Sequence, residues 1–226
     1  MTDSNELSPV EIEGIYEARF TDSDLDFKRQ LWRVLVDRVF QRYISPDDTV
    51  LDLGAGTCEF INAVRCKERI AVDLNPQVRK FAIDAVPIVS SSDALTEVKD
   101  GTIDVVFSSN LFEHLADKKV LLATLREVHR VLQPQGKIMI LIPNVRYLPG
   151  RYWDYFDHHI PLTHLSMTEA LQLAGFSPER VVPRFLPYTV KQRLAPRSIW
   201  ILRLYLRLPF LWPIFGRQML IVAGRV

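Results

Sequence analysis

Short apolar, strand-like segments alternate with helix-like segments five times between residues 49 and 174 of the 226-residue chain. Parallel strands need a crossover between them, usually a helix, and such crossovers are right-handed. The alternation therefore predicts an α/β fold in which helices cover both faces of a doubly wound, mostly parallel sheet. Two further strand-like segments near the C-terminus bring the expected sheet to seven strands. The expected strands are 49–53, 69–73, 86–89, 103–107, 137–142, 180–185 and 219–223.

The helix-like segments and two insertions define the expected domain organisation. Residues 26–44 carry apolar side chains at helical spacing, so we expect residues 1–48 to form an N-terminal helical cap. Residues 49–226 then form the main domain, with an aromatic insertion at 145–166 after the fifth strand and a basic, apolar insertion at 188–217 between the sixth and seventh strands. The helices expected in the main domain are 57–67, 76–85, 121–132 and 168–174.

The loop after the first expected strand is rich in glycine. Gly54 and Gly56 permit a tight turn and a close approach of the backbone to a ligand. A dinucleotide fingerprint would place a third glycine at position 59, where this chain has Glu59, whose carboxylate would repel a pyrophosphate. Asp52 adds a second negative charge, so a cationic ligand suits the loop better. Asp73, which ends the second strand, can accept hydrogen bonds from two ribose hydroxyls.

These residues belong to a set of segments that resembles the motifs of class I S-adenosylmethionine-dependent methyltransferases. The resemblance implies a Rossmann-like methyltransferase fold with S-adenosylmethionine as the cofactor. It covers residues 49–144 and, less specifically, 168–176. The chain departs from the pattern at Cys58, where many members of the class have a third glycine. The segments that carry the resemblance are 50–57 (Val-Leu-Asp-Leu-Gly-Ala-Gly-Thr), 71–76 (Ala-Val-Asp-Leu-Asn-Pro), 92–94 (Ser-Asp-Ala), 103–115 and 125–136.

The resemblance also implies a cofactor site at the ends of the first four strands. Asp52, Gly54, Ala55 and Gly56 would surround the methionine part of the cofactor, and Asp73, with its neighbour Leu74, would hold the ribose. Asp93, with its neighbour Ala94, would meet the adenine amino group. Asn110 and Leu111 would close the pocket.

The chemistry of methyl transfer indicates which further side chains to look for. Transfer from a sulfonium ion needs alignment of the acceptor and exclusion of water, because the donor is already activated. A hydroxyl acceptor also needs a base to take its proton. His114, just after the fourth strand, lies at the expected edge of the sheet and is one candidate. Its alternative role is structural, as a pocket-shaping pair with Glu113.

The insertion after the fifth strand supplies further candidates. His158 and His159 could each act as a base, and Asp157 could orient either imidazole. A metal site that combines these three residues with Asp154 is disfavoured, and no metal is expected. The neighbouring aromatic side chains could form a wall for a sugar or another ring, or instead a plug that packs the insertion onto the core. They are Tyr152, Trp153, Tyr155 and Phe156.

The C-terminal part of the chain is strongly basic. Nine of the 28 Lys and Arg residues lie between residues 180 and 226, where there is no Asp or Glu, although the formal net charge of the whole chain is only +1. Within 196–215, one side of an expected helix carries three arginines together with an aromatic and an aliphatic side chain. They are Arg197, Arg203, Arg207, Trp200 and Leu204, of which Arg197 lies outside the residues that the structure describes. Such a segment is suited to peripheral contact with an anionic membrane. The alternative is that its aliphatic face packs on this domain or on a twin subunit in a homodimer.

The aromatic insertion and the basic tail together are similar to methyltransferases associated with the assembly of bacterial cell-surface glycans and lipid-linked sugars. This resemblance implies O-methylation of a sugar, a glycan or a lipid-linked small molecule. The alternatives are a quinone- or lipid-directed methyltransferase and a cofactor-binding scaffold without transfer activity. The near-neutral total charge gives no reason to expect a nucleic-acid partner.

The cysteines and the N-terminus bear on the compartment. Cys58 and Cys66 are expected on one helix, about 12 Å apart along its axis, which is beyond the reach of a disulfide. The acidic N-terminus lacks the apolar core of a signal peptide, and the chain has no apolar run of the roughly 18 residues that a spanning helix needs. We therefore expect a cytoplasmic protein, either free or peripheral on the inner face of the membrane.

Overall fold

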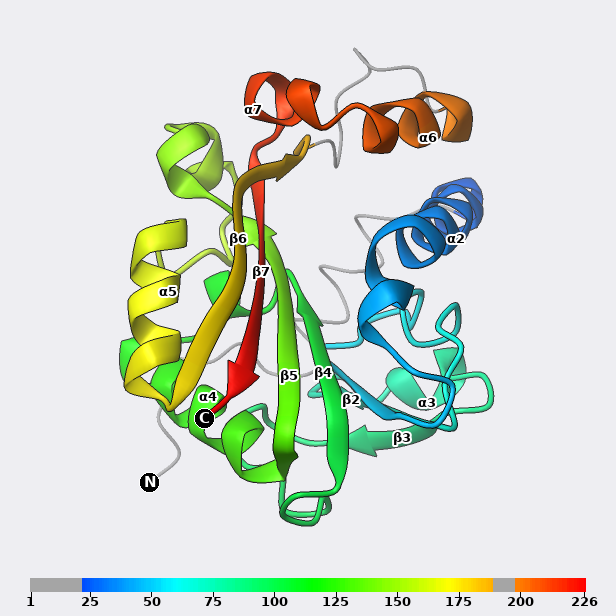
Figure 1. Ribbon diagram of the computed structural model, residues 1–226, viewed down its shortest axis with the longest axis vertical. Coiled ribbons are helices and arrows are strands. Elements are labelled where there is room, and N and C mark those ends of the chain that lie inside the picture. Colours follow the sequence, from blue (N-terminus) through cyan, green and yellow to red (C-terminus); the bar gives the residue numbers. More distant parts are fainter. Residues whose placement is uncertain (1–21, 189–197) are drawn as a thin grey trace.

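Seven strands form a single sheet in the computed structural model, which describes residues 22–188 and 198–226. Their order across the sheet is β3-β2-β1-β4-β5-β7-β6, and all neighbouring pairs are parallel except that β7 runs antiparallel to both β5 and β6 (Figure 1). This confirms the predicted mostly parallel, doubly wound α/β fold. The strands are β1 (Thr49–Leu53), β2 (Glu68–Asp73), β3 (Val86–Val89), β4 (Ile103–Ser109), β5 (Leu132–Pro143), β6 (Phe176–Leu186) and β7 (Gln218–Arg225).

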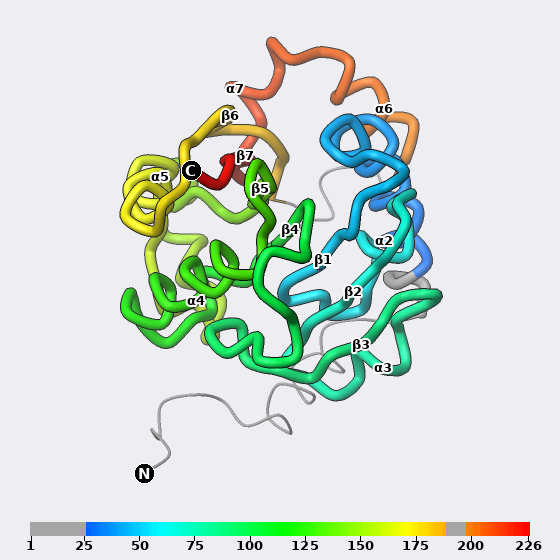
Figure 2. Tube along the Cα trace, turned by 60° about the horizontal axis from the view of Figure 1, so that its bottom comes forward, coloured from blue at the N-terminus to red at the C-terminus, as the bar shows by residue number. Residues whose placement is uncertain are grey.

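Helices pack on both faces of this sheet, as Figure 2 shows, and several short 3₁₀ turns connect the elements. The first described helix continues without interruption through a π-helical and a 3₁₀ segment, so helical backbone spans most of the predicted 26–44. The α-helices are α2 (Asp22–Leu35), α3 (Val78–Phe81), α4 (Lys118–Val131), α5 (His164–Leu173), α6 (Ile199–Arg207) and α7 (Trp212–Phe215). The π segment is η1 (Val36–Phe40), and the 3₁₀ turns are η2 (Gln41–Tyr43), η3 (Phe112–His114), η4 (Val145–Tyr147), η5 (Arg151–Asp154) and η6 (Pro209–Leu211).

Two hydrophobic cores, one on each face of the sheet, follow from the period-2 geometry of its strands. Alternate residues of a strand point to opposite faces. In β5, Ile138 and Ile140 belong to the core beneath α4 and α5, whereas Met139 and Leu141 belong to the core beneath α2 and α6. Because both faces are covered, the central strands are mostly apolar, which is the pattern that made them recognisable in the sequence.

The helix predicted at 57–67 is absent from the structure, which has only turns there. Gly56 and Cys58 both take a left-handed backbone conformation, with φ of 52° and 61°, which a right-handed helix cannot contain. The Asn62 side chain then ties the segment to its neighbour, since its amide donates to Phe81 O at 2.7 Å and its carbonyl accepts from Ile83 N at 2.8 Å. Cys58 and Cys66 are free thiols, as expected, but they do not lie on one helix.

Several element boundaries also differ from the prediction. The helix predicted at 76–85 is reduced to α3, four residues long. Helix α4 begins earlier than expected because Asp117 caps it by accepting from Lys119 N at 2.6 Å. Helix α5 also begins earlier, at a capping box in which Thr163 and Ser166 bond each other's backbone amides. Strand β5 extends back to Leu132, directly after α4.

The N-terminal helical segment packs against the sheet through aromatic rings. Trp32 meets Phe107 of β4 edge-on at 5.7 Å between ring centroids, and Phe40 meets the same ring at 5.0 Å. The division at residue 48 stays a prediction, and residues 1–21 of the proposed cap lie outside the described residues. In the described part of the chain, no helix is both long and apolar enough to cross a bilayer.

Candidate functional site

The glycine-rich loop is fixed by hydrogen bonds to the end of β2. The backbone amides of Gly54 and Ala55 both donate to Val72 O, at 2.9 and 3.0 Å. Gly54 has a φ of +74°, and a Cβ atom there would lie 3.1 Å from Leu111 Cβ. Only glycine satisfies both conditions without strain, so the loop and the segment after β4 are matched to each other at this point.

Asp73 holds the loop from the opposite side. One carboxylate oxygen accepts from Gly56 N at 2.7 Å, and the other accepts from Asn75 N at 2.8 Å. Burial raises the pKa of this carboxyl above its usual value, although both hydrogen bonds oppose the shift. Each carboxylate oxygen has a second lone pair, so Asp73 can brace the loop and still accept hydrogen bonds from a ligand. The predicted ribose position is consistent with this geometry.

The loop lies in a strongly negative surrounding. Asp52 is 3% exposed, and its pKa is raised well above its ordinary range by burial and by the nearby carboxylates of Glu59 and Asp73. A cation bound beside these groups would relieve their mutual repulsion. However, part of the charge is already matched, because Lys28 Nζ of α2 lies 3.1 Å from a carboxylate oxygen of Glu59. From the sequence, the Glu59 carboxylate was expected to favour a cationic ligand, and its ion pair with Lys28 was not anticipated.

The loop accommodates Cys58 at the position where many members of the class have a third glycine. This residue takes the left-handed conformation that glycine adopts most easily. Its thiol is fully buried, and burial raises the pKa of the thiol to about 12. The side chain therefore stays protonated and packs beneath the loop as a small apolar group.

The other predicted cofactor residues also lie beyond the carboxyl ends of the parallel strands, where ligands bind in such sheets. Asp93 follows β3 and accepts a hydrogen bond from the Ser91 hydroxyl at 2.5 Å, and Ala94 beside it is exposed. Asn110 follows β4 in a left-handed conformation, and its side-chain oxygen accepts from Gln218 Nε2 at 3.2 Å. Leu74, after β2, is 37% exposed.

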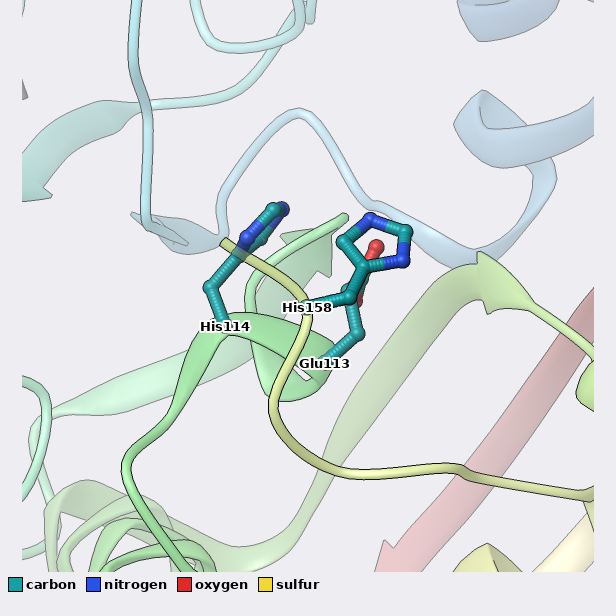
Figure 3. A group of neighbouring side chains, drawn as sticks. All are labelled: Glu113, His114 and His158. Carbon is teal, nitrogen blue, oxygen red and sulfur yellow. The ribbon is translucent and has the colours of Figure 1, made fainter. Parts of the chain in front are cut away.

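Two of the three candidate bases come together with an acid in one cluster, Glu113, His114 and His158 (Figure 3). The rings of the two histidines lie 4.9 Å apart. His114 Nδ1 lies 2.8 Å from the backbone oxygen of Asp157 and 3.4 Å from its carboxylate. From the sequence, Asp157 was expected to orient His158 or His159, and this contact with His114 was not anticipated. The third candidate, His159, is exposed, and its backbone amide donates to Glu113 O at 2.8 Å.

Glu113 is the member of the cluster that sequence reasoning treated only as a structural partner. Its side chain is 1% exposed, and neither carboxylate oxygen has a hydrogen-bond partner among residues 22–188 and 198–226. Burial, with a contribution from Asp157, raises the pKa of this carboxyl to about 8. A buried acid that titrates near neutral pH is typical of functional sites. In the sequence, only the position of Glu113, directly before His114 and shortly after β4, indicated that it could belong to the site.

The aromatic insertion divides between packing and exposure. Tyr152 is fully buried and its hydroxyl donates to Ile160 O, whereas Trp153 is 55% and Phe156 85% exposed. Tyr155 stacks on the His158 ring at 5.1 Å between centroids and hydrogen bonds to Tyr188, which follows β6. Tyr152 therefore packs the insertion onto the core, and a wall for a ring-shaped ligand stays a prediction for the exposed side chains. Tyr188 was not among the predicted residues.

The cluster of Glu113, His114 and His158 is also the set of described residues whose geometry comes nearest to a metal site. Each side chain offers one potential ligand atom, and these atoms lie within 4.8 Å of one another. Zinc binds nitrogen and oxygen ligands at about 2.0–2.2 Å, so the side chains would have to close around such an ion. Of the four residues considered as ligands from the sequence, only His158 is in this set.

The buried Glu113 carboxyl makes a prediction for stability. Its pKa in the folded chain, about 8, exceeds the ordinary value of 4.5, so the folded state binds a proton that the unfolded state releases between these values. Its contribution to the free energy of unfolding is therefore complete below about pH 4.5 and is lost as the pH rises towards 8. We expect urea unfolding at pH 5 and pH 8 to differ less for Glu113→Gln than for the wild type. The exposed Glu97→Gln is the control, and an equal pH dependence in all three proteins would contradict the assignment.

Comparison with known proteins agrees with this geometry. Residues 51–140 match the model of a family described as a methyltransferase domain. An uncharacterized protein of Methanocaldococcus jannaschii is 25% identical over 137 residues, which are 59% of this chain and 52% of that protein, so the match spans about half the length of this curated relative.

Solved structures share the fold. An S-adenosylmethionine-dependent methyltransferase from Archaeoglobus fulgidus superposes with a TM-score of 0.65 at 21% identity, over 87% of this chain and 94% of that one. A Haloferax volcanii methyltransferase, solved with its activator Trm112, gives 0.64 at 21% identity over 86% and 89% of the two chains. The geranyl diphosphate C-methyltransferase of Streptomyces coelicolor, solved with S-adenosylhomocysteine, gives 0.61 at 20% identity over 86% and 76%. Residues 51–140 thus match a methyltransferase domain, and the chain has the fold of S-adenosylmethionine-dependent methyltransferases.

Proposed function

We propose that the domain transfers a methyl group from S-adenosylmethionine to a hydroxyl oxygen of a sugar, a glycan or a lipid-linked small molecule. The observation that carries the proposal is the cluster of Glu113, His114 and His158. The cluster begins two residues after Leu111, whose side chain faces Gly54 of the glycine-rich loop. An alcohol acceptor requires a base at such a place, whereas an acceptor without an acidic proton does not.

The residues around the loop would bind and orient the cofactor. Asp73 would accept hydrogen bonds from the ribose hydroxyls, and Asp93 from the adenine amino group. The buried negative charge of Asp52 favours a cationic ligand over a pyrophosphate. When bound, S-adenosylmethionine supplies a methyl group that is already activated by the sulfonium charge. The protein then has to align the acceptor and exclude water.

The histidine cluster would handle the proton of the acceptor. When bound, S-adenosylmethionine would give up its methyl group and keep the electron pair of the carbon–sulfur bond. The acceptor proton passes to an imidazole of His158 or His114. The Glu113 carboxyl, with a pKa of about 8, can share a proton with these rings near neutral pH. Asp157, beside His114, would stabilise the protonated form of that ring.

The acceptor class is inferred from the aromatic insertion. Trp153 and Phe156 are exposed in the same insertion that supplies His158, and an aromatic face with polar neighbours suits a sugar ring. A lipid-linked acceptor would bring the enzyme to the inner face of a membrane, through the segment 196–215. A homodimer through the same segment is the alternative assembly.

A second candidate is a lipid-directed or quinone-directed methyltransferase. The observation that favours it is the fold similarity to geranyl diphosphate methyltransferases, whose acceptor carries an apolar chain. In those enzymes the acceptor atom is a carbon, as the name C-methyltransferase states. The two candidates therefore differ in the atom that receives the methyl group.

Labelling of the acceptor distinguishes the candidates. The protein is incubated with S-adenosylmethionine labelled in its methyl group and with aqueous and lipid extracts of bacterial cells, and the labelled product is identified by mass spectrometry. We expect an O-methyl ether on a sugar or a lipid-linked sugar. A label on carbon or nitrogen would refute O-methylation. Absence of product from a protein that binds the cofactor would favour the scaffold.

A further inference from the structure

A cleft with three arginines lies outside the cofactor site, between the N-terminal helical segment and α6. Its volume is about 230 Å³. Figures 1 and 2 show α6 beside α2, at the end of the molecule that also carries α7. Arg38 comes from η1, some 160 residues away in sequence from the α6 residues that face it. The residues that line the cleft are Arg38, Trp200, Arg203, Leu204 and Arg207.

The orientation of α6 is fixed by its inner face. Tyr205 is 9% exposed, and its hydroxyl donates to Phe185 O at 2.6 Å. Leu202 and Leu206 pack against the core beneath this helix. The intramolecular packing weighed as one alternative for this segment thus occupies the aliphatic face. It leaves the opposite face, with Arg203 and Arg207, directed outward.

The positive charge of the cleft has no matching carboxylate in the part of the chain that the structure describes. Within residues 22–188 and 198–226, no carboxylate forms an ion pair with Arg38, Arg203 or Arg207. The guanidinium group presents a planar fork of donors that fits phosphate oxygens. Three such groups line this one cleft.

Exposed apolar side chains accompany these charges. Trp200, in the cleft itself, is 69% exposed, and the neighbouring Phe210, Ile214 and Phe215 of η6 and α7 are 54–68% exposed. This part of the chain is held firmly, since Arg184 donates to Ile214 O at 2.7 Å and Trp212 Nε1 donates to Tyr205 O at 3.1 Å. Large apolar side chains next to arginines are typical of surfaces that lie at a membrane interface.

We propose that the arginine cleft binds the phosphate groups of anionic phospholipids, while Trp200 and the exposed side chains of η6 and α7 enter the interface. The occupant is a lipid bilayer because a free phosphate would use the arginines but would leave the apolar side chains in water. The inference concerns a binding surface and holds whatever acceptor the domain methylates. It adds Arg38 to the surface, which lies outside the segment predicted from the sequence.

Co-sedimentation of the full chain with vesicles tests the proposal. The wild type is expected to bind vesicles of phosphatidylcholine with phosphatidylglycerol at low salt, and to bind vesicles of phosphatidylcholine alone weakly. Each arginine near an anionic surface strengthens binding roughly fivefold. The double variant Arg203→Gln/Arg207→Gln should therefore lower the partition coefficient by about 25-fold, and adding Arg38→Gln should lower it further.

Two controls separate the contributions. Arg126→Gln removes an exposed arginine of α4, far along the chain from the cleft, and should leave binding unchanged. Trp200→Ser keeps all three arginines and should still weaken binding to anionic vesicles. Wild-type binding that is equal on both vesicle types, or a triple variant that binds as the wild type does, would overturn the proposal. Two results together would assign the cleft to free phosphate instead. They are that millimolar inorganic phosphate displaces the wild type from anionic vesicles and that Trp200→Ser binds these vesicles as the wild type does.

Discussion

Replacing Asp73 with alanine is expected to lower the affinity for S-adenosylmethionine by at least 100-fold while the chain remains folded. In the proposed site, this carboxylate accepts hydrogen bonds from two ribose hydroxyls, and hydrogen bonds to a charged group are worth about 1.5–3 kcal/mol each. The substitution also frees the backbone amides of Gly56 and Asn75, which the carboxylate now holds at 2.7 and 2.8 Å. Loop order and ligand contacts are therefore lost together.

A pair of variants measured by calorimetry separates these two causes. Asp73→Asn retains an oxygen that can accept one of the two backbone amides, but it lacks the charge and the second acceptor. We expect its affinity for S-adenosylmethionine to lie between those of the wild type and Asp73→Ala. Asp100→Asn, which alters an exposed carboxylate paired with Arg130, is the control and should bind normally. Undiminished binding by Asp73→Ala, with circular dichroism showing a folded chain, would remove this residue from the cofactor site.

The strands were predictable because their signal is local. Each of these strands contains a short apolar run bounded by turn residues, and β1 and β3 were predicted with the bounds that the structure has. The mostly parallel direction of the strands followed from the crossover rule, which needs no side-chain detail, whereas their order across the sheet comes from the structure. The seven-stranded architecture was therefore within reach of the sequence alone.

The missing helix after the glycine-rich loop was not predictable, because its causes are distant in sequence. Cys58 adopts a conformation that favours glycine, and nothing in its residue type indicates this. The bonds from the Asn62 side chain to Phe81 and Ile83 form only when the second and third strands are in place. Local helical spacing gave the wrong prediction because these tertiary contacts outweigh it.

The candidate base cluster was predicted in part. His114 was placed at the right edge of the sheet by its position after β4, and His158 by its position in the insertion that follows β5. Their meeting depends on how the insertion folds back, which is fixed where the amides of His159 and Ile160 both donate to Glu113 O. This contact also buries Glu113, so neither its burial nor its raised pKa could be anticipated from residue types.

Replacing His158 with alanine is expected to lower the rate of methyl transfer by 10²- to 10⁴-fold, the range typical of a lost general base. His158 is 6% exposed and lies between the Tyr155 ring and the His114 ring, so its position is defined by packing. It belongs to the insertion after β5 and not to the glycine-rich loop that would hold the cofactor. Affinity for S-adenosylmethionine should therefore change by less than about twofold, since only the transition state loses an interaction.

The measurement uses the acceptor identified by methyl labelling, with kcat and KM determined for both substrates. His159→Ala is the matched control, because this adjacent imidazole is exposed and should not support the reaction. A base that acts through proton removal should respond to added imidazole, which can enter the space left in His158→Ala and restore part of the rate. His114→Ala should show a similar loss if both rings share the proton, and a smaller one if it only orients His158. If His158→Ala retained the wild-type rate, as His159→Ala is expected to do, the cluster would be structural and the acceptor would be one that needs no base.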